Sequence, residues 1–248
     1  MYIDIPFLYF TFLLTLVKIL TNRKILYFIY KGGITIEQKC ISPVTLKRLP
    51  TYLSYLKSLP EDASSYISAT AIANALQMGD VQVRKDLAAV SDKGKPKVGY
   101  KVKDLINELE TYLGCNKMED VVLVGAGKLG KVLLNYKGFE EYGINIAAAF
   151  DINDSVISDT NIPKPIYHLS KLTDLCSETK IHMGILTVPV ENAQSACDYM
   201  IQCGIRAIMN FTPTPLKVPG NVLIQNVNIA ASLALLSKQL SEQTYNMM

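Results

Sequence analysis

The sequence is poor in the side chains that bind metal ions or build disulfide frameworks. It has only two histidines, and its five cysteines show no metal-type spacing. Because five is an odd number, reduced thiols in a cytoplasmic protein are the simplest interpretation. Charged residues make up 19% of the chain and the net charge is +3, so a surface for nucleic acid would have to be local. The low charge excludes a protein that is polycationic over its whole surface, and the few histidines and the cysteine spacing argue against a metal site. We expect neither His168 nor His182 to be catalytic.

The first 35 residues differ from the rest of the chain. Residues 5–20 are almost entirely apolar, yet this run is short for a membrane span and has no signal-peptide cleavage site. Lys31-Gly32-Gly33 is what a purine-rich ribosome-binding sequence encodes, and Ile36 stands where an initiation codon would lie. We therefore expect residues 1–35 to be an artefact of the gene start. A genuine anchor and a soluble helix are the alternatives, and a membrane partner is expected only if this leader is genuine.

The clearest motif is a dinucleotide-binding fingerprint at residues 121–151. A β-branched run is followed at once by Gly-x-Gly-x-x-Gly, and a second apolar run ends in Asp151. Gly125 would allow the tight turn, Gly127 would let the backbone approach a pyrophosphate, and Gly130 would let the next helix pack closely on the sheet. Asp151 would bind the adenine ribose, which favours NAD(H) over NADP(H). A tight strand–helix turn without a ligand is the alternative. The expected loop residues are Gly125, Ala126, Gly127, Lys128, Leu129 and Gly130.

The segment before this motif predicts a helix-turn-helix followed by a basic hairpin. Residues 45–59 have helical apolar spacing, with Pro50 in the first turn. We expect Ser68 to be the N-cap residue of a helix over 69–76. A glycine turn then leads to a helix over 81–90, which is the order of a helix-turn-helix. Lysines alternating with Gly and Pro suit a wing that carries cations to DNA. The expected DNA-binding residues are Arg48, Gln82, Arg84, Lys85, Lys93, Lys95, Lys97 and Tyr100.

Within this set, Gln82 and Arg84 would reach base edges in the major groove and Lys85 would contact phosphate. The alternative is a solvated helical face with a charged surface loop.

After Asp151 the chain predicts further strand–helix units of a doubly wound parallel sheet, whose strand ends carry the ligand crevice. The expected nicotinamide-pocket residues are Thr187, Val188, Pro189, Asn210 and Phe211, with core and turn positions as the alternative.

Taken together, these motifs resemble the bacterial Rex family of redox-sensing transcriptional repressors, from about residue 41 to residue 240. The stretches that carry the resemblance are Lys47-Arg48-Leu49-Pro50 with Tyr52, Val83-Arg84-Lys85-Asp86-Leu87, Gly94 and Gly99-Tyr100, the glycine loop with Tyr136, Leu186-Thr187-Val188-Pro189 and Met209-Asn210-Phe211-Thr212-Pro213. The resemblance implies an α/β protein with an N-terminal winged-helix domain, a Rossmann-type doubly wound parallel sheet and a C-terminal dimer-swapped helix. The implied segments are 36–114, 118–228 and 229–248.

The same resemblance implies a homodimer that binds a palindromic operator in double-stranded DNA. NADH would release the DNA, and NAD⁺ would compete and favour the bound form. Tyr136 would lie near the nicotinamide, and the apolar helix over 229–240 would reach the partner subunit rather than pack on its own sheet. The implied protein is a repressor and no enzyme.

The chain also departs from the family pattern. Leu53-Ser54 replaces a usual Tyr-Arg, Asn228 replaces a usual acidic residue, and Ala88-Ala89-Val90-Ser91 replaces an aromatic stretch. Loss of that Arg and that Asp predicts the absence of an interdomain ion pair and puts the details of the NADH switch in question. The alternative functions are an NAD-dependent dehydrogenase and a nucleotide- or CoA-binding module without a DNA role.

Overall fold

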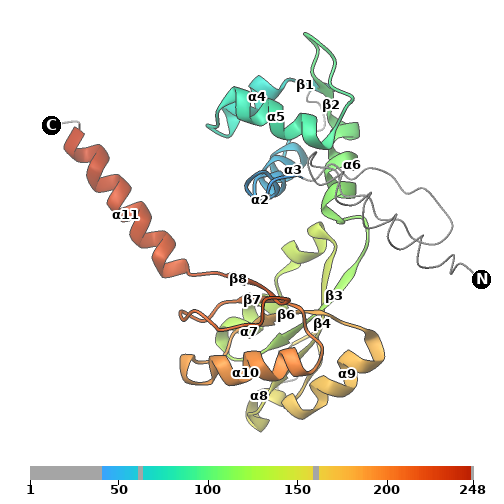
Figure 1. Cartoon of the computed structure of the whole chain (residues 1–248), viewed down its shortest axis with the longest axis vertical. Coiled ribbons are helices and arrows are strands. Elements are labelled where there is room, and N and C mark those ends of the chain that lie inside the picture. Colours follow the sequence, from blue (N-terminus) through green and yellow to red (C-terminus); the bar gives the residue numbers. More distant parts are fainter. Residues whose placement is uncertain (1–40, 61–63, 159–161, 247–248) are drawn as a thin grey trace, which may run out of the picture. The chain divides into compact units, whose positions relative to one another are not determined.

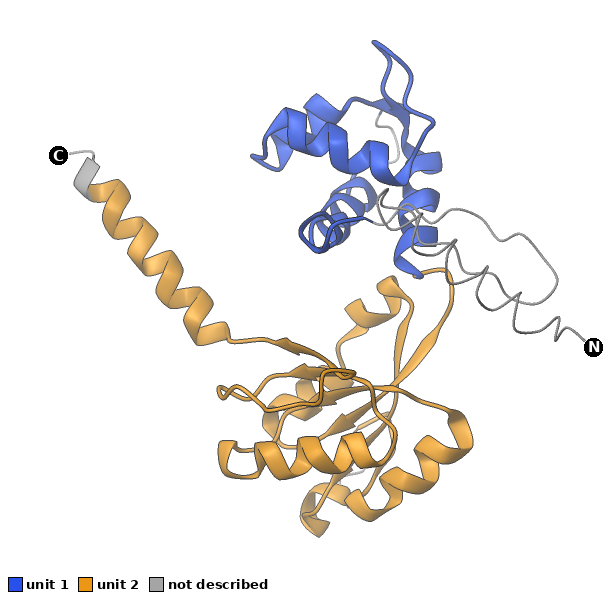
Figure 2. Ribbon diagram, in the orientation of Figure 1, with its two compact units in different colours: residues 1–114 blue, residues 115–248 orange. Residues whose placement is uncertain are grey.

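The computed structural model describes residues 41–60, 64–158 and 162–246 (Figure 1). The expected leader, residues 1–35, lies outside them. The chain divides into two compact units, with the boundary between Gly114 and Cys115 (Figure 2). Within the described residues, none of the helices combines the length and the apolar character that a membrane crossing requires.

Unit 1 is a small helical domain with a two-stranded ribbon. Its elements are α2 (Pro43–Leu46), α3 (Leu49–Lys57), β1 (Tyr66–Ile67), α4 (Ala69–Ala75), α5 (Asp80–Val90), β2 (Tyr100–Lys101) and α6 (Val102–Leu113). Buried leucines of α3 and α6 form the centre of this unit together with Ile72, Val83 and Leu87 of the helix-turn-helix. The Ser68 side chain accepts a hydrogen bond from the Ala71 N–H at 3.0 Å, which confirms it as the N-cap of α4.

Two sequence predictions in unit 1 need correction. The helix predicted over 45–59 is two helices, α2 and α3, and Pro50 lies in the first turn of the second. Proline lacks an N–H and its ring would clash with the carbonyl of Leu46, so one helix does not run through this position. The basic hairpin is also closed by an isolated bridge rather than by two regular strands. Lys95 and Gly99 exchange two backbone hydrogen bonds of 2.9 Å, and β2 pairs antiparallel with β1 instead of with a strand of the basic segment.

Unit 2 is built on a six-stranded parallel sheet, which confirms the doubly wound prediction. The strands are β3 (Glu119–Val124), β4 (Ile144–Asp151), β5 (Ile166–His168), β6 (Met183–Leu186), β7 (Ala207–Asn210) and β8 (Leu223–Asn226). Their order is β5-β4-β3-β6-β7-β8, so the direction of winding reverses between β3 and β6. In such sheets the ligand crevice lies at the carboxyl ends of these two strands.

Helices and 3₁₀ turns connect the strands and cover the sheet. They are α7 (Lys128–Leu134), η1 (Lys137–Tyr142), α8 (Asp154–Ile157), η2 (Leu169–Lys171), α9 (Leu172–Thr179) and α10 (Val190–Gln202). One core cluster packs strand residues such as Phe150 against α9 and α10, and a second packs Leu123 and Ala149 against Leu134 of α7. The central strands β3, β4 and β6 are therefore buried on both faces toward their carboxyl ends, which explains their continuous apolar runs.

The apolar side chains of the last element, α11 (Ile229–Asn246), are not buried within the chain as far as residue 244. Ile229, Leu233, Leu236 and Leu240 are 60–66% exposed and repeat at intervals of four, three and four residues. That spacing places them on one side of the helix. The alternative that this helix packs on its own sheet is therefore wrong for the described residues of the single chain.

Candidate functional site

The glycine loop after β3 forms a cradle at the carboxyl end of the sheet. Gly125 has φ +98°, and a Cβ there would lie 2.8 Å from the carbonyl carbon of Thr187. A Cβ on Gly130 would overlap the carbonyl oxygen of Gly125, so the loop and α7 approach as closely as the sequence predicts. Gly127 is different, because nothing lies within 4 Å of the position that its Cβ would occupy. The protein itself requires the first and third glycines, whereas the second faces open space that a ligand can enter.

Asp151, at the end of β4, braces this cradle. One carboxylate oxygen accepts from the Ala126 N–H at 2.8 Å, and the other accepts from the N–H groups of Ile152 at 2.8 Å and Asn153 at 3.0 Å. On the opposite side, the Thr187 hydroxyl donates to the Gly125 carbonyl at 2.6 Å. These bonds fix the loop to the ends of β4 and β6. The carboxylate also lines the adjoining cavity, which suits a group that binds ribose hydroxyls.

A cavity of about 550 Å³ opens beside the cradle, which is the usual size of a small-molecule site. The sequence-predicted residues that line it are Gly125, Gly127, Asp151, Thr187, Val188 and Pro189. Sequence reasoning missed Asn192, Ser195, Ala196 and Tyr199 of α10, which line its other wall. Their spacing of three, four and seven residues was the available signal, because it places them on one helix face directly after Pro189.

Other predicted cofactor residues lie outside this cavity lining. Lys128 and Leu129 begin α7 and are exposed, whereas Ala126 and Gly130 are buried behind the loop. Tyr136 is 60% exposed and its ring meets Phe139 edge to face at 5.3 Å.

Asn210 and Phe211 differ from their predicted role. The Asn210 side chain is fully buried and donates to the Thr214 carbonyl at 3.0 Å and to Asn226 Oδ1 at 2.8 Å. It also accepts from the Thr212 N–H at 2.9 Å, so its amide is occupied in holding the turn after β7 against β8. Phe211 packs against the apolar cluster beneath α7. The core-and-turn alternative describes both residues better than the predicted pocket does.

Unit 1 carries the predicted basic residues on α5 and on the turn before β2. Gln82, Arg84 and Lys85 are exposed, and Arg84 pairs with Asp80 one turn earlier on α5 at 2.7 Å. On the turn, Lys93 pairs with Glu108 at 2.8 Å and Lys95 lies over the Tyr66 ring at 5.9 Å. Lys97 has φ +63° at the tip and is exposed. These side chains form an exposed cationic surface, as a phosphate-binding surface requires.

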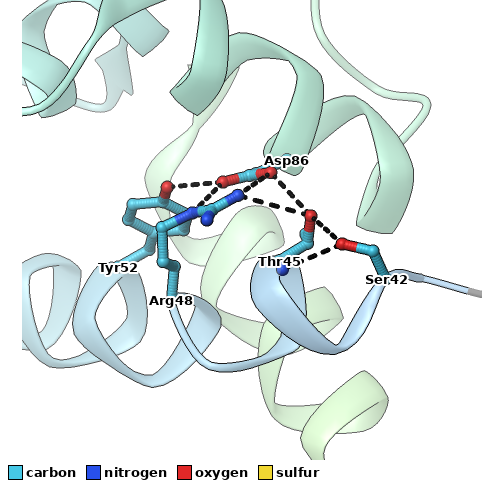
Figure 3. Close-up of polar contacts among 5 residues, drawn as sticks. All are labelled: Ser42, Thr45, Arg48, Tyr52 and Asp86. Carbon is cyan, nitrogen blue, oxygen red and sulfur yellow. Dashed lines mark hydrogen bonds and ion pairs between the residues drawn. The ribbon is translucent and has the colours of Figure 1, made fainter.

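Arg48 and Tyr100 differ from the prediction that they face DNA, because the structure places them inside unit 1. Tyr100 is 8% exposed, and burial, together with the charge of Glu108, raises the pKa of its hydroxyl. Arg48 donates to both carboxylate oxygens of Asp86, at 2.7 Å from Nε and 2.8 Å from Nη2 (Figure 3). Burial raises the pKa of Asp86, but hydrogen bonds from Arg48, Tyr52 and Thr45 outweigh it and leave this pKa below its usual value.

Among the described residues, no group of three or more His, Cys, Asp or Glu side chains is placed to hold a metal ion. His168 lies at the end of β5 beside the Ser170 hydroxyl, and His182 contacts the Gly204 carbonyl at 3.1 Å. Neither histidine lines the cavity beside the cradle.

Two protein-family models match the chain, one on each side of the boundary between its two units. Residues 40–88 match a family described as a putative DNA-binding protein N-terminus, and residues 116–214 match the CoA binding domain family. A redox-sensing transcriptional repressor Rex from Porphyromonas gingivalis is 44% identical over 193 residues, which cover 77% of this chain and 88% of that protein. The Rex repressor of Treponema denticola is 40% identical, over 81% of this chain and 95% of that protein.

The chain belongs to the Rex family of redox-sensing transcriptional repressors. Solved Rex structures share its fold. Crystal structures of RSP, one with β-NAD⁺ and operator DNA and one with β-NADH, superpose with a TM-score of 0.75 at 33% identity. They cover 84% of this chain, and it covers 96% and 97% of theirs. The Rex resemblance stated from the sequence is therefore confirmed, and so is the fold class of the two units.

Proposed function

We propose that this Rex-family chain is a transcriptional repressor that binds inverted-repeat operator DNA as a homodimer. NADH releases it from the DNA and NAD⁺ competes, so its occupancy of the operator reports the cellular ratio of the two. The observation that carries the proposal is the combination, on one chain, of a glycine cradle beside a cavity and a helix-turn-helix with exposed cations. A relative with this arrangement, RSP, has been crystallised with β-NAD⁺ and operator DNA.

The cradle fits a dinucleotide because the space above Gly127 is open. The pyrophosphate would lie against Gly127 and the first turn of α7, where Lys128 adds a positive charge. Asp151 would accept hydrogen bonds from the adenine ribose, while Thr187 and Pro189 would border the ligand. Tyr136 stays a proposed contact on the nicotinamide side.

On unit 1, Gln82 and Arg84 of α5 would face base edges and Lys85 would contact phosphate. Lysines of the turn before β2 would bind the backbone beside the major-groove site. Because these contacts are mainly electrostatic, the affinity would fall steeply as the salt concentration rises.

The exposed stripe of α11 supplies the surface for the homodimer. A helix with five leucine or isoleucine side chains more than half exposed, four of them in one stripe, needs a partner, and a second copy of this chain offers the same stripe. A two-fold dimer would match the two half-sites of an inverted repeat.

A nucleotide- or CoA-binding module is the second candidate, favoured by the match of residues 116–214 to the CoA binding domain family. That module would leave the exposed cations of α5 without a role. The dehydrogenase alternative is weaker, because the curated relatives are repressors and neither histidine borders the cavity. We propose that the protein catalyses no hydride turnover and works in the cytoplasm, where its operator lies.

The decisive experiment measures DNA binding against both cofactors. The full chain is used to select inverted-repeat duplexes from a randomised pool, and the selected duplex is then followed by fluorescence anisotropy. We expect NADH to weaken binding at least fivefold, which corresponds to about 1 kcal/mol of coupling, and NAD⁺ to leave it unchanged or strengthen it. Equal binding with and without saturating NADH would refute the switch. It would also agree with the expectation that Ser54 and Asn228, which replace the usual ion-pair residues, impair the NADH switch. The Asn228 side chain instead accepts from the Ala231 N–H at 2.9 Å at the start of α11.

A further inference from the structure

A buried polar cluster joins α2 and α3 to the helix that carries the candidate base contacts (Figure 3). At its centre the Asp86 carboxylate, on α5, is 4% exposed. It accepts four hydrogen bonds: two from Arg48, one from the Tyr52 hydroxyl at 2.7 Å and one from the Thr45 hydroxyl at 3.0 Å. Four donors use all the strong acceptor positions of a carboxylate, so its position is fixed.

Arg48 is held in one orientation by this cluster. Its guanidinium meets Asp86 side-on through Nε and Nη2, and Nη2 also reaches the Thr45 hydroxyl at 3.4 Å. The Arg48 side chain is only 20% exposed. A planar fork that meets a carboxylate with two bonds loses its rotational freedom. Arg48 therefore presents a fixed set of donors to whatever lies beside it on α5.

Gln82 lies beside it, one helical turn before Asp86 on the same face of α5. With its carboxamide oxygen toward the guanidinium, that oxygen accepts from Arg48 Nη1 at 3.2 Å. It also lies 2.8 Å from Nε, whose single N–H it shares with Asp86. The opposite orientation would set the NH₂ group of Gln82 against the donors of Arg48. The hydrogen-bond network therefore directs the oxygen inward and the NH₂ group away from Arg48.

We propose that Arg48 is a positioning residue that makes Gln82 a donor-only reader of a base edge. The inference rests on the proposed function, in which α5 lies in the major groove. A free glutamine reads adenine with both groups, since its oxygen accepts from N6 and its NH₂ donates to N7. Once the oxygen is engaged by Arg48, only the donor remains. Gln82 then favours a base that presents acceptors alone, above all guanine with O6 and N7, and disfavours adenine.

The test compares base preference rather than overall affinity. Duplexes are selected by the full wild-type chain from a randomised inverted-repeat pool, and the preference at each position is measured by sequencing. The key variant is Arg48→Met with Asp86→Leu, because replacing a buried ion pair by apolar side chains of similar volume disturbs the fold less than removing one partner, which leaves a buried charge. The Tyr52 hydroxyl loses its acceptor in this variant, so circular dichroism first verifies that it folds. The matched control is Lys57→Met with Glu110→Leu, which removes an ion pair of 2.7 Å between α3 and α6. Gln82→Ala identifies the position that Gln82 reads.

We expect wild type to prefer guanine over adenine on the order of tenfold at the position that Gln82→Ala makes indifferent. The R48M/D86L variant should lose that preference and accept adenine there, while its other positions and its salt dependence match those of the control. In the Q82A background the same double change should have no further effect at this position. A wild-type preference for adenine there, or an unchanged preference in R48M/D86L, overturns the inference and leaves the repressor function intact. No enrichment of any duplex by wild type would overturn both.

Discussion

The candidate phosphate-binding sites of the two units are built from different groups. Unit 2 uses the backbone: glycines at the end of β3 leave room at Gly127, and Asp151 fixes the loop by accepting from three N–H groups. Unit 1 uses side chains, and only those that stay exposed are available. Arg48 has Asp86 as a partner and is withdrawn into the domain, whereas Lys85 and Lys97 stay exposed. A backbone site is thus decided by local conformation, and a side-chain site is decided by tertiary contacts.

The largest expected effect is the loss of stability when the buried Asp86 carboxylate of unit 1 is removed. Asp86→Ala leaves the guanidinium of Arg48 in a site where it is only 20% exposed, without its carboxylate. We expect the free energy of unfolding to fall by about 3 kcal/mol, near the lower end for a broken buried pair because Arg48 keeps some solvent contact. Urea unfolding followed by circular dichroism measures it.

Asp104→Ala is the matched control for that change. Its carboxylate pairs with Lys101 at 3.6 Å, and both side chains are more than two-fifths exposed. Exposed pairs of this kind contribute less than about 1 kcal/mol, even with the helix N-terminus nearby. Equal losses in the two variants would contradict the distinction between buried and exposed pairs in this unit.

The next effect separates two glycines of one motif in unit 2. Gly130→Ala places a methyl group on the Gly125 carbonyl oxygen, and we expect it to lower the free energy of unfolding by about 2 kcal/mol. Gly127→Ala places one in open space at φ −66°, so the thermal unfolding temperature should change little. Its affinity for NADH should nevertheless fall more than tenfold, because the methyl group occupies the place of the pyrophosphate.

These two outcomes are read by thermal unfolding and by titration of NADH fluorescence. If Gly127→Ala destabilised unit 2 as strongly as Gly130→Ala, the glycine would be structural and the open space would not be a ligand site. If both variants bound NADH normally, the cradle would not hold the cofactor at all.

The same contrast explains what the sequence could predict. The glycine loop, the parallel sheet and most of the cavity edge follow from patterns that the local chain must satisfy, so Gly125, Asp151 and Pro189 lie where they were expected. The break between α2 and α3 was also present in the sequence, because Pro50 forbids one continuous helix.

The errors concern residues whose roles depend on distant partners. No spacing rule shows that Arg48 meets a carboxylate on another helix, that Tyr100 is buried, or that Asn210 is saturated by the turn after its own strand. The wall of α10 was missed for a related reason. Asn192 and Tyr199 share a helix face, but only the packing of α10 on the sheet turns that face toward the cradle.

A smaller effect is the loss of stability of unit 1 at acid pH, which we expect from the Asp86 carboxylate. Because the pKa of Asp86 in the folded chain lies below its unfolded value of about 3.9, the stability that Asp86 contributes is complete above that pH. It is lost as the pH falls through the lower folded value. Urea unfolding of the full chain at about pH 6 and about pH 3 should therefore show a loss of stability that the R48M/D86L variant lacks. An identical loss in that variant would place the acid sensitivity elsewhere.

The smallest effect is on the alkylation rates of the thiols in unit 2. These rates show how readily the packed interior of that unit opens to solvent. Burial, with a smaller contribution from Cys203, raises the pKa of Cys176 to about 11, and burial also raises the pKa of Cys197. Thiolate is the reactive form, so at neutral pH both should react with iodoacetamide more slowly than Cys203, which is partly exposed. Mass spectrometry of the labelled peptides gives the three rates.

The raised pKa values also set a direction for stability at high pH. The contribution of the two buried thiols is present below the unfolded pKa of about 8.5 and decreases as the pH rises toward the folded value. Gly130→Ala should speed labelling of Cys176 and Cys197, because it destabilises unit 2 and so exposes both thiols more often, whereas Gly127→Ala should not. Equal labelling of all three thiols in wild type would mean that unit 2 opens readily, and a rigid backbone cradle could then not account for cofactor binding.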